Sequence, residues 1–153
     1  MFVSRPLTVL ALVAMVSTTP ALRPAAAQGF SEPPAGTTLR ADILDAMRPH
    51  AEWSFGAPVE FVVREMRVAG DTAFVWASAQ RPGGGTIALA DTPLVQRDGR
   101  PIDLVDGPEV QALLKRSGRT WVAVHHAEGA TDAWWWSVDF CPGWGEVLPN
   151  SCG

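Results

Sequence analysis

The residues of this chain best suited to chemistry lie in a short segment that contains two adjacent histidines. The segment His125-His126-Ala127-Glu128 is followed closely by Asp132. On a β-strand alternate side chains share a face, so His126 and Glu128 would lie together and His125 would lie opposite. Imidazole and carboxylate groups exchange protons near neutral pH, and the same groups ligate zinc. His126, Glu128 and Asp132 are therefore the candidate catalytic or metal-binding residues.

The same residues have an ordinary structural explanation. Two ligand types at positions i and i+2 are common by chance, and no H-E-x-x-H pattern accompanies them. A strand end with one surface histidine and one hydrogen-bonded histidine would look the same, and Asp132 could cap a turn. We therefore expect no metal and no cofactor. The alternative hypothesis is a small-ligand or metal-dependent enzyme that uses His126, Glu128 and Asp132.

Tryptophan is the other unusual residue type. The chain has seven Trp and no Tyr, and Trp134, Trp135 and Trp136 are consecutive. Exposed indoles stack on sugar rings and anchor interfaces, whereas buried indoles fill a core. Three consecutive side chains cannot all point inward, so at least one is expected at the surface. The pattern leaves open whether the three tryptophans belong to the core or form a binding patch. If they form a patch, we expect the loop at Gly83 to Gly85 to be part of it.

Other kinds of site lack the patterns they require. The triple glycine at Gly83 to Gly85 has no Lys-Ser/Thr pair and no following helix, which a phosphate loop needs. No G-x-S-x-G nucleophile elbow occurs. The net charge of −4 becomes −6 when Arg5 and Arg23 are removed with the predicted leader. This acidic balance argues against general nucleic-acid binding and against adhesion to anionic membranes.

The N-terminal segment has the pattern of a secretory signal peptide. Arg5 precedes an apolar run over residues 7–16, and Ala25-Ala26-Ala27 offers a cleavage site before Gln28. The run is too short to span a bilayer, which takes roughly 20 residues. We therefore expect a signal peptide over 1–27, a flexible leader over 28–37 and a single domain over 38–153, with no membrane span. The mature protein is expected to be periplasmic or secreted.

The two cysteines fit an oxidising compartment. Cys141 and Cys152 lie close together near the C-terminus and are the only cysteines. Their spacing is too wide for C-x-x-C redox chemistry, and a zinc site needs more ligands. The sequence therefore predicts a structural Cys141–Cys152 disulfide, which should contribute about 3 kcal/mol in the chain-entropy model.

Hydrophobic spacing predicts a helix and two strand hairpins. Apolar residues from Leu39 to Met47 share one helical face, and Pro49 is expected to end or kink this helix. The segments 58–68 and 72–80 form the first hairpin, and apolar residues change from odd to even positions within 58–68, which indicates a bulge. A long loop over 81–107 is expected to hold a short strand near 86–90. Segment 109–117 suits either a strand or a short helix; we favour a strand that pairs with 120–126.

These elements support a resemblance to a known group of folds. The segments Leu39 to Met47, Pro58 to Val68, Asp71 to Gln80 and Leu113 to Val124 resemble small exported bacterial proteins of unknown function, similar to the cystatin-like or NTF2-like group. The resemblance implies an α+β fold: one N-terminal helix packed on a curved, mostly antiparallel four-stranded sheet, followed by a C-terminal disulfide-stapled loop. Typical NTF2-like enzymes have more N-terminal helices, which build a deep pocket.

The expected function is a non-enzymatic binding or envelope-associated module outside the cytoplasm. Its partner would be an unidentified protein or glycan of the cell envelope, contacted by Trp134, Trp135 and Trp136. An inhibitor-like domain that inserts its loops into a partner enzyme is a further possibility that the cystatin-like resemblance allows. Fold alone does not choose among these functions.

Overall fold

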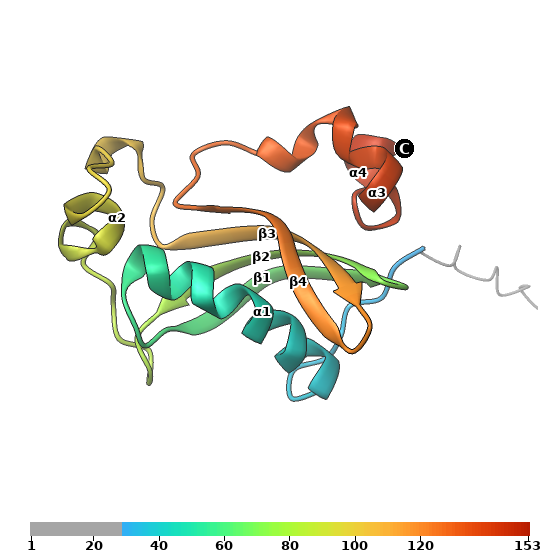
Figure 1. Ribbon diagram of the computed structural model, residues 1–153, viewed down its shortest axis with the longest axis horizontal. Coiled ribbons are helices and arrows are strands. Elements are labelled where there is room, and N and C mark those ends of the chain that lie inside the picture. Colours follow the sequence, from blue (N-terminus) through green and yellow to red (C-terminus); the bar gives the residue numbers. More distant parts are fainter. Residues whose placement is uncertain (1–28) are drawn as a thin grey trace, which may run out of the picture.

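A computed structural model describes residues 29–153 as an antiparallel sheet covered on both faces (Figure 1). Helix α1 (Thr38–Phe55) packs on one face, and the C-terminal tail, made of short helical turns, packs on the other. This arrangement confirms the α+β prediction of one helix on a four-stranded antiparallel sheet. The predicted signal peptide, with Gln28, lies outside the described residues.

The sheet is a simple meander. Strands β1 (Glu60–Ala69), β2 (Thr72–Gln80), β3 (Glu109–Ser117) and β4 (Thr120–Glu128) pair in the order β1-β2-β3-β4. The third segment is thus a strand, as favoured from the sequence. The β1–β2 register shifts between Val63 and Glu65, which confirms the predicted bulge. Phe61 and Val63 before the bulge and Met66 after it consequently all pack against the helix side.

A second register shift decides where the histidines lie. Leu113 pairs with His125 whereas Leu114 pairs with Ala123, so Val124 has no partner position in β3. Ala123 packs with the core beneath α1. Because one residue is inserted, His125 points to the tail side and His126 to the α1 side.

Helix α1 is longer than the sequence indicated, because Pro49 lies inside it. The missing proline N–H leaves the Asp45 carbonyl without its helical donor, but both residues are exposed to solvent, so water can replace it. The proline costs about 3 kcal/mol. Burial of Phe55 contributes about 1.5–3 kcal/mol, and Ala51 is buried on the same face. The helix instead ends at Gly56, whose φ of 80° suits a glycine C-cap.

The connection over residues 81–107 contains helical turns where a short strand was predicted near 86–90. They are η1 (Leu89–Asp91), α2 (Pro93–Gln96) and η2 (Ile102–Leu104). Ile87 and Leu89 pack as separate anchors on the α1 core, and Pro93 starts α2 in the first-turn position that proline favours. The prediction of a strand was wrong because isolated apolar anchors imitate strand alternation.

The segment before α1 is attached to the sheet at one point. Ser31 and Val68 exchange backbone hydrogen bonds of 2.8 Å in both directions, at the outer edge of β1. This contact covers part of the edge strand. Within residues 29–153, no helix combines the length and apolar character needed to cross a membrane.

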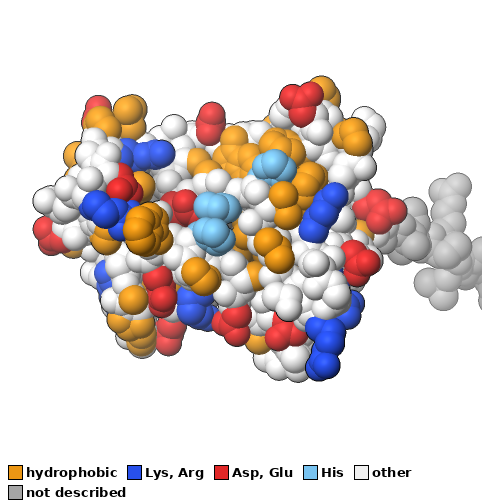
Figure 2. Space-filling model, viewed as in Figure 1, with side chains coloured by type: hydrophobic (Ala, Val, Ile, Leu, Met, Phe, Trp, Pro, Cys, Tyr) orange, Lys and Arg blue, Asp and Glu red, His pale blue; other side chains and the backbone are white. Residues whose placement is uncertain are grey.

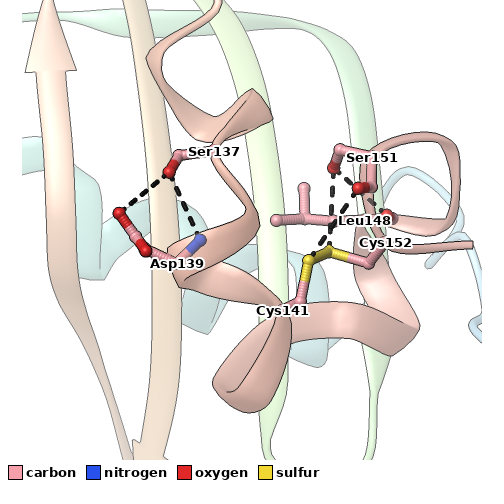
Figure 3. Close-up of a disulfide and its surroundings, with 6 residues drawn as sticks. All are labelled: Ser137, Asp139, Cys141, Leu148, Ser151 and Cys152. Atoms are coloured by element: carbon pink, nitrogen blue, oxygen red, sulfur yellow. Dashed lines mark hydrogen bonds between the residues drawn. A yellow bond between two sulfur atoms is a disulfide. The ribbon is translucent and has the colours of Figure 1, made fainter.

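The tail forms a second hydrophobic core on the face opposite α1. Its turns are η3 (Trp134–Trp136), η4 (Val138–Phe140), α3 (Cys141–Trp144), η5 (Gly145–Val147) and α4 (Pro149–Cys152). Trp135, Trp144 and Leu148 pack on Phe74 and Leu113 of the sheet. The predicted disulfide is present, with Cα atoms of Cys141 and Cys152 5.4 Å apart (Figure 3). The disulfide closes the loop that carries Trp144 and Leu148 of this second core.

Candidate functional site

The histidine segment has the face distribution predicted for a strand. His126 Nδ1 lies 2.9 Å from Glu128 Oε1, while His125 contacts the rings of Phe140 and Trp144 on the tail side. A third histidine, which no motif in the sequence indicated, joins them: the ring centroid of His50 on α1 is 3.8 Å from that of His126. Histidine side chains accordingly lie next to each other at the surface in Figure 2. The α1 side thus carries a cluster of His50, His126 and Glu128.

Asp132 does not join this cluster. It lines a hollow with Trp76 and Gln111, on the tail side of the sheet. Among residues 29–153 no group of three or more His, Cys, Asp or Glu side chains is arranged to hold a metal ion. The proposed combination of His126, Glu128 and Asp132 is therefore divided between the two faces of the sheet.

The histidine pair has an electrostatic consequence. Burial of the His50 ring, together with the neighbouring His126, lowers the pKa of His50 below its usual value, and the Glu128 carboxylate opposes this shift. An unfolded chain would protonate His50 near the ordinary value of about 6.5. The contact between α1 and β4 is consequently most favourable when His50 is neutral.

Stability should therefore fall when the pH drops below about 6.5. The unfolded state then takes up a proton at His50 before the folded state does, and the loss continues until the lower folded-state pKa is passed. Urea unfolding at pH 7.5 and at pH 5 measures the effect, and His50→Gln should reduce the difference between the two pH values. An unchanged difference in this variant would show that groups other than His50 cause the acid sensitivity.

The tryptophan run is divided between core and surface. Trp135 is 9% exposed, and its ring centroid lies 5.2 Å from Phe74 and 5.8 Å from Trp76. Trp134 is half-buried and donates its indole N–H to Gln111 Oε1 at 2.9 Å. Trp136 is 55% exposed. One indole thus anchors the tail, one is held by a hydrogen bond, and one is presented to solvent.

Trp136 lies at a hollow that we call the tryptophan hollow. It has a volume of about 230 Å³ and combines aromatic, charged and amide side chains. Its lining residues are Glu65, Arg67, Trp76, Trp135, Trp136, Leu148, Asn150 and Ser151. Asn150 and Ser151 belong to the loop closed by the disulfide, and Figure 3 shows Ser151 beside it. The two ends of the tail therefore supply opposite parts of one concave surface.

A hydrogen-bonded carboxylate fixes the Trp76 wall of this hollow. Glu109, with its side chain only 10% exposed, accepts hydrogen bonds from Trp76 Nε1 at 2.6 Å and Arg64 Nη2 at 2.9 Å. Ser78 also donates to this carboxylate. The Arg64 guanidinium in turn lies 5.8 Å from the centre of the Trp76 ring. The indole is therefore held in place before any ligand arrives.

A second ion pair borders the tryptophan hollow. Arg67 pairs with Glu65 and donates to the carbonyl of Val147 at 2.8 Å. The Arg67 side chain is 11% exposed, and its guanidinium also lies over the Phe74 ring. By residue type alone, Arg64, Arg67, Glu60 and Glu65 would suggest a solvated strand face. The sequence of β2 indicated that the face opposite α1 is covered too, because its apolar residues Phe74 and Val75 lie on opposite faces of the strand.

The glycine loop lies apart from the tryptophans. Gly83 donates its backbone N–H to Glu60, and Gly85 pairs with Arg81 beyond the end of β2. None of Gly83 to Gly85 lines the tryptophan hollow. The run from Trp134 to Trp136 instead shares its hollow with Trp76, Asn150 and Ser151. The sequence did not indicate these neighbours because they come from distant parts of the chain.

The chain matches no protein-family model, and no curated protein sequence and no solved structure is significantly similar to it.

Proposed function

We propose that the protein is an exported, non-enzymatic binding module of the cell envelope, and that its tryptophan hollow binds a glycan. The observation that carries the proposal is the exposed Trp136 indole beside a hollow walled by Trp76 and Trp135. An exposed tryptophan in a concave surface with preorganised neighbours is the usual form of a binding hot spot.

The lining of the hollow suits a sugar ring in particular. The apolar face of a pyranose can stack on an indole, and its hydroxyl groups need donors and acceptors at the rim. Asn150 offers both, Ser151 offers a hydroxyl, and the Glu65–Arg67 pair offers a carboxylate and a guanidinium. Opposite charges in the pair leave no strong preference for a charged ligand at this position.

Export rests on two properties of the chain. The Cys141–Cys152 disulfide is typical of proteins that fold in oxidising compartments, and residues 1–27 have the composition of a signal peptide. We propose that the helix-on-meander core resembles the cystatin-like group more than NTF2-like enzymes, and the single helix α1 before the sheet supports this proposal. The enzyme hypothesis loses support because Asp132 lies away from His126 and Glu128.

Calorimetric titration with two soluble oligosaccharides tests the glycan proposal. The ligands are β-1,4-linked tetramers of N-acetylglucosamine and of glucose, used with the wild type, Trp136→Ala and Trp53→Ala. At least one ligand should bind, and Trp136→Ala should weaken it at least about tenfold, the equivalent of 1.4 kcal/mol.

Trp53→Ala provides the matched control because Trp53 is 66% exposed on α1 and does not line the hollow. Its affinity should equal that of the wild type. Absence of binding by both oligosaccharides, or equal loss in the two variants, would contradict the proposal.

A further inference from the structure

A second hollow shares Trp76 and Trp135 with the tryptophan hollow. We call it the acidic hollow; it has a volume of about 230 Å³, smaller than pockets for drug-sized ligands, which measure about 300–1,000 Å³. Its lining residues are Trp76, Asp106, Gln111, Ala130, Thr131, Asp132, Ala133 and Trp135. The volume is sufficient for a single small head group.

The charged side chains that line the acidic hollow are both acidic. Its charged lining residues are Asp106 and Asp132, and no Lys or Arg lines it. This differs from the tryptophan hollow, where Arg67 balances Glu65. Both aspartates are exposed at the surface, so their charges attract a ligand without a large desolvation cost.

The walls of the acidic hollow favour a cation that also carries apolar groups. Indole rings attract cations through their negative faces, and Trp76 already has a guanidinium on one side, that of Arg64. Ala130 and Ala133 add methyl groups to the wall. Two indoles, two methyl groups and two carboxylates match an alkylammonium group, whose positive charge is spread over apolar methyl or methylene groups.

The two aspartates are held near each other by the backbone. Asp106 donates its N–H to the carbonyl of Gly129, and Gly129 donates to the carbonyl of Glu109. Gly129 has a φ of 64°, and a Cβ there would lie 2.6 Å from Val105 Cγ1, so only glycine fits. The loop that carries Asp106 is thus fixed against the segment that leads to Asp132 before a ligand binds.

We propose that the acidic hollow binds an alkylammonium group, such as the head group of a quaternary ammonium compound. The proposal does not depend on glycan binding, because Asp106, Gln111 and Asp132 line the acidic hollow and not the tryptophan hollow, whereas Trp136 and Asn150 line only the tryptophan hollow. The tail side of the sheet would then bind a cation as well as a glycan.

Choline provides the probe, and its neutral isostere 3,3-dimethylbutan-1-ol provides the ligand control. Binding is followed by the indole N–H resonances of Trp76 and Trp135 in two-dimensional NMR spectra of the full mature chain. Choline should shift both resonances saturably, and the neutral isostere should bind at least about threefold more weakly. Equal binding of the two compounds, or no saturable shift with choline, would overturn the proposal.

Charge-removing variants locate the site. Asp106→Asn and Asp132→Asn should each weaken choline binding about threefold, and the double variant about tenfold. Asp71→Asn is the matched control, because Asp71 is an exposed aspartate in the β1–β2 turn beside Arg116. Unchanged affinity in the Asp106/Asp132 double variant, with its spectrum otherwise native, would overturn the proposal.

The ammonium group could belong to a free small molecule or to a lipid head group. Co-sedimentation with phosphatidylcholine vesicles distinguishes these sources: binding that the double variant loses assigns a lipid head group, whereas choline binding without co-sedimentation assigns a free ligand. Co-sedimentation that the double variant retains, without any choline binding, would contradict the acidic hollow as the site.

Discussion

Trp135→Ala is expected to lower the free energy of unfolding by about 3–5 kcal/mol, the usual cost of truncating a buried tryptophan. Trp135 is 9% exposed and contacts the rings of Phe74, Trp76 and Trp134. Its loss leaves a cavity between the tail and the sheet that the disulfide-closed loop cannot easily fill. Urea unfolding followed by far-ultraviolet circular dichroism measures the change.

Two exposed tryptophans provide the comparison. Trp136→Ala and Trp53→Ala remove side chains that are 55% and 66% exposed, so each should cost less than about 1 kcal/mol. A similar cost for Trp135→Ala would mean that the tail does not form a second core. A large cost for Trp136→Ala would mean that this indole is needed for packing and would weaken its assignment to binding.

Removal of the disulfide should have the next largest effect. Cys141 and Cys152 are separated by 11 positions, and closing a loop of this size contributes about 3 kcal/mol by restricting the unfolded chain. The loop carries Trp144 and Leu148, which are buried against the sheet. The double variant Cys141→Ser/Cys152→Ser should therefore unfold at a lower urea concentration than the wild type.

The same variant should also bind glycan less well, because the loop positions Asn150 and Ser151 in the tryptophan hollow. The wild type measured with its disulfide chemically reduced gives an independent check, without substitution of either cysteine. A double variant as stable as the oxidised wild type would show that packing alone holds the tail. Full glycan affinity in a destabilised but folded variant would exclude Asn150 and Ser151 from the site.

Much of the sheet could be predicted because its residues repeat with a regular period. The change in parity between Val63 and Met66 led to the bulge, since each side chain in a strand has only two directions available. The spacing of Cys141 and Cys152, together with the oxidising compartment that the predicted signal peptide implies, also predicted the disulfide. These predictions used local information alone.

The predictions that failed concern features decided by distant contacts. The path of α1 through Pro49 depends on burial of Ala51 and Phe55 beneath the sheet, which outweighs a local signal. The tail has no regular hydrophobic repeat, so the sequence offered only indirect evidence that it packs on β2 and β3. The signal was in β2 itself, where Phe74 and Val75 are apolar on opposite faces and both require a cover.

The candidate site was only partly foreseeable for the same reason. The run from Trp134 to Trp136 was identified by composition, but its division into core and surface followed from how the tail lies on the sheet. The inserted residue Val124 sends His126 toward His50, a pairing between α1 and β4 that no local motif encodes. Asp132 follows the strand closely in sequence yet lies on its other face.

Site-resolved NMR most directly tests the claim that the tail face is a glycan-binding surface. Each of the seven tryptophans has one indole N–H resonance, so titration with the N-acetylglucosamine or glucose tetramer reports on every indole separately. Saturable shifts are expected for the indole N–H resonances of Trp76, Trp135 and Trp136, and those of Trp53 and Trp121 should stay unchanged. Shifts confined to Trp53 or Trp121, or no shift at any tryptophan with either tetramer, would contradict it.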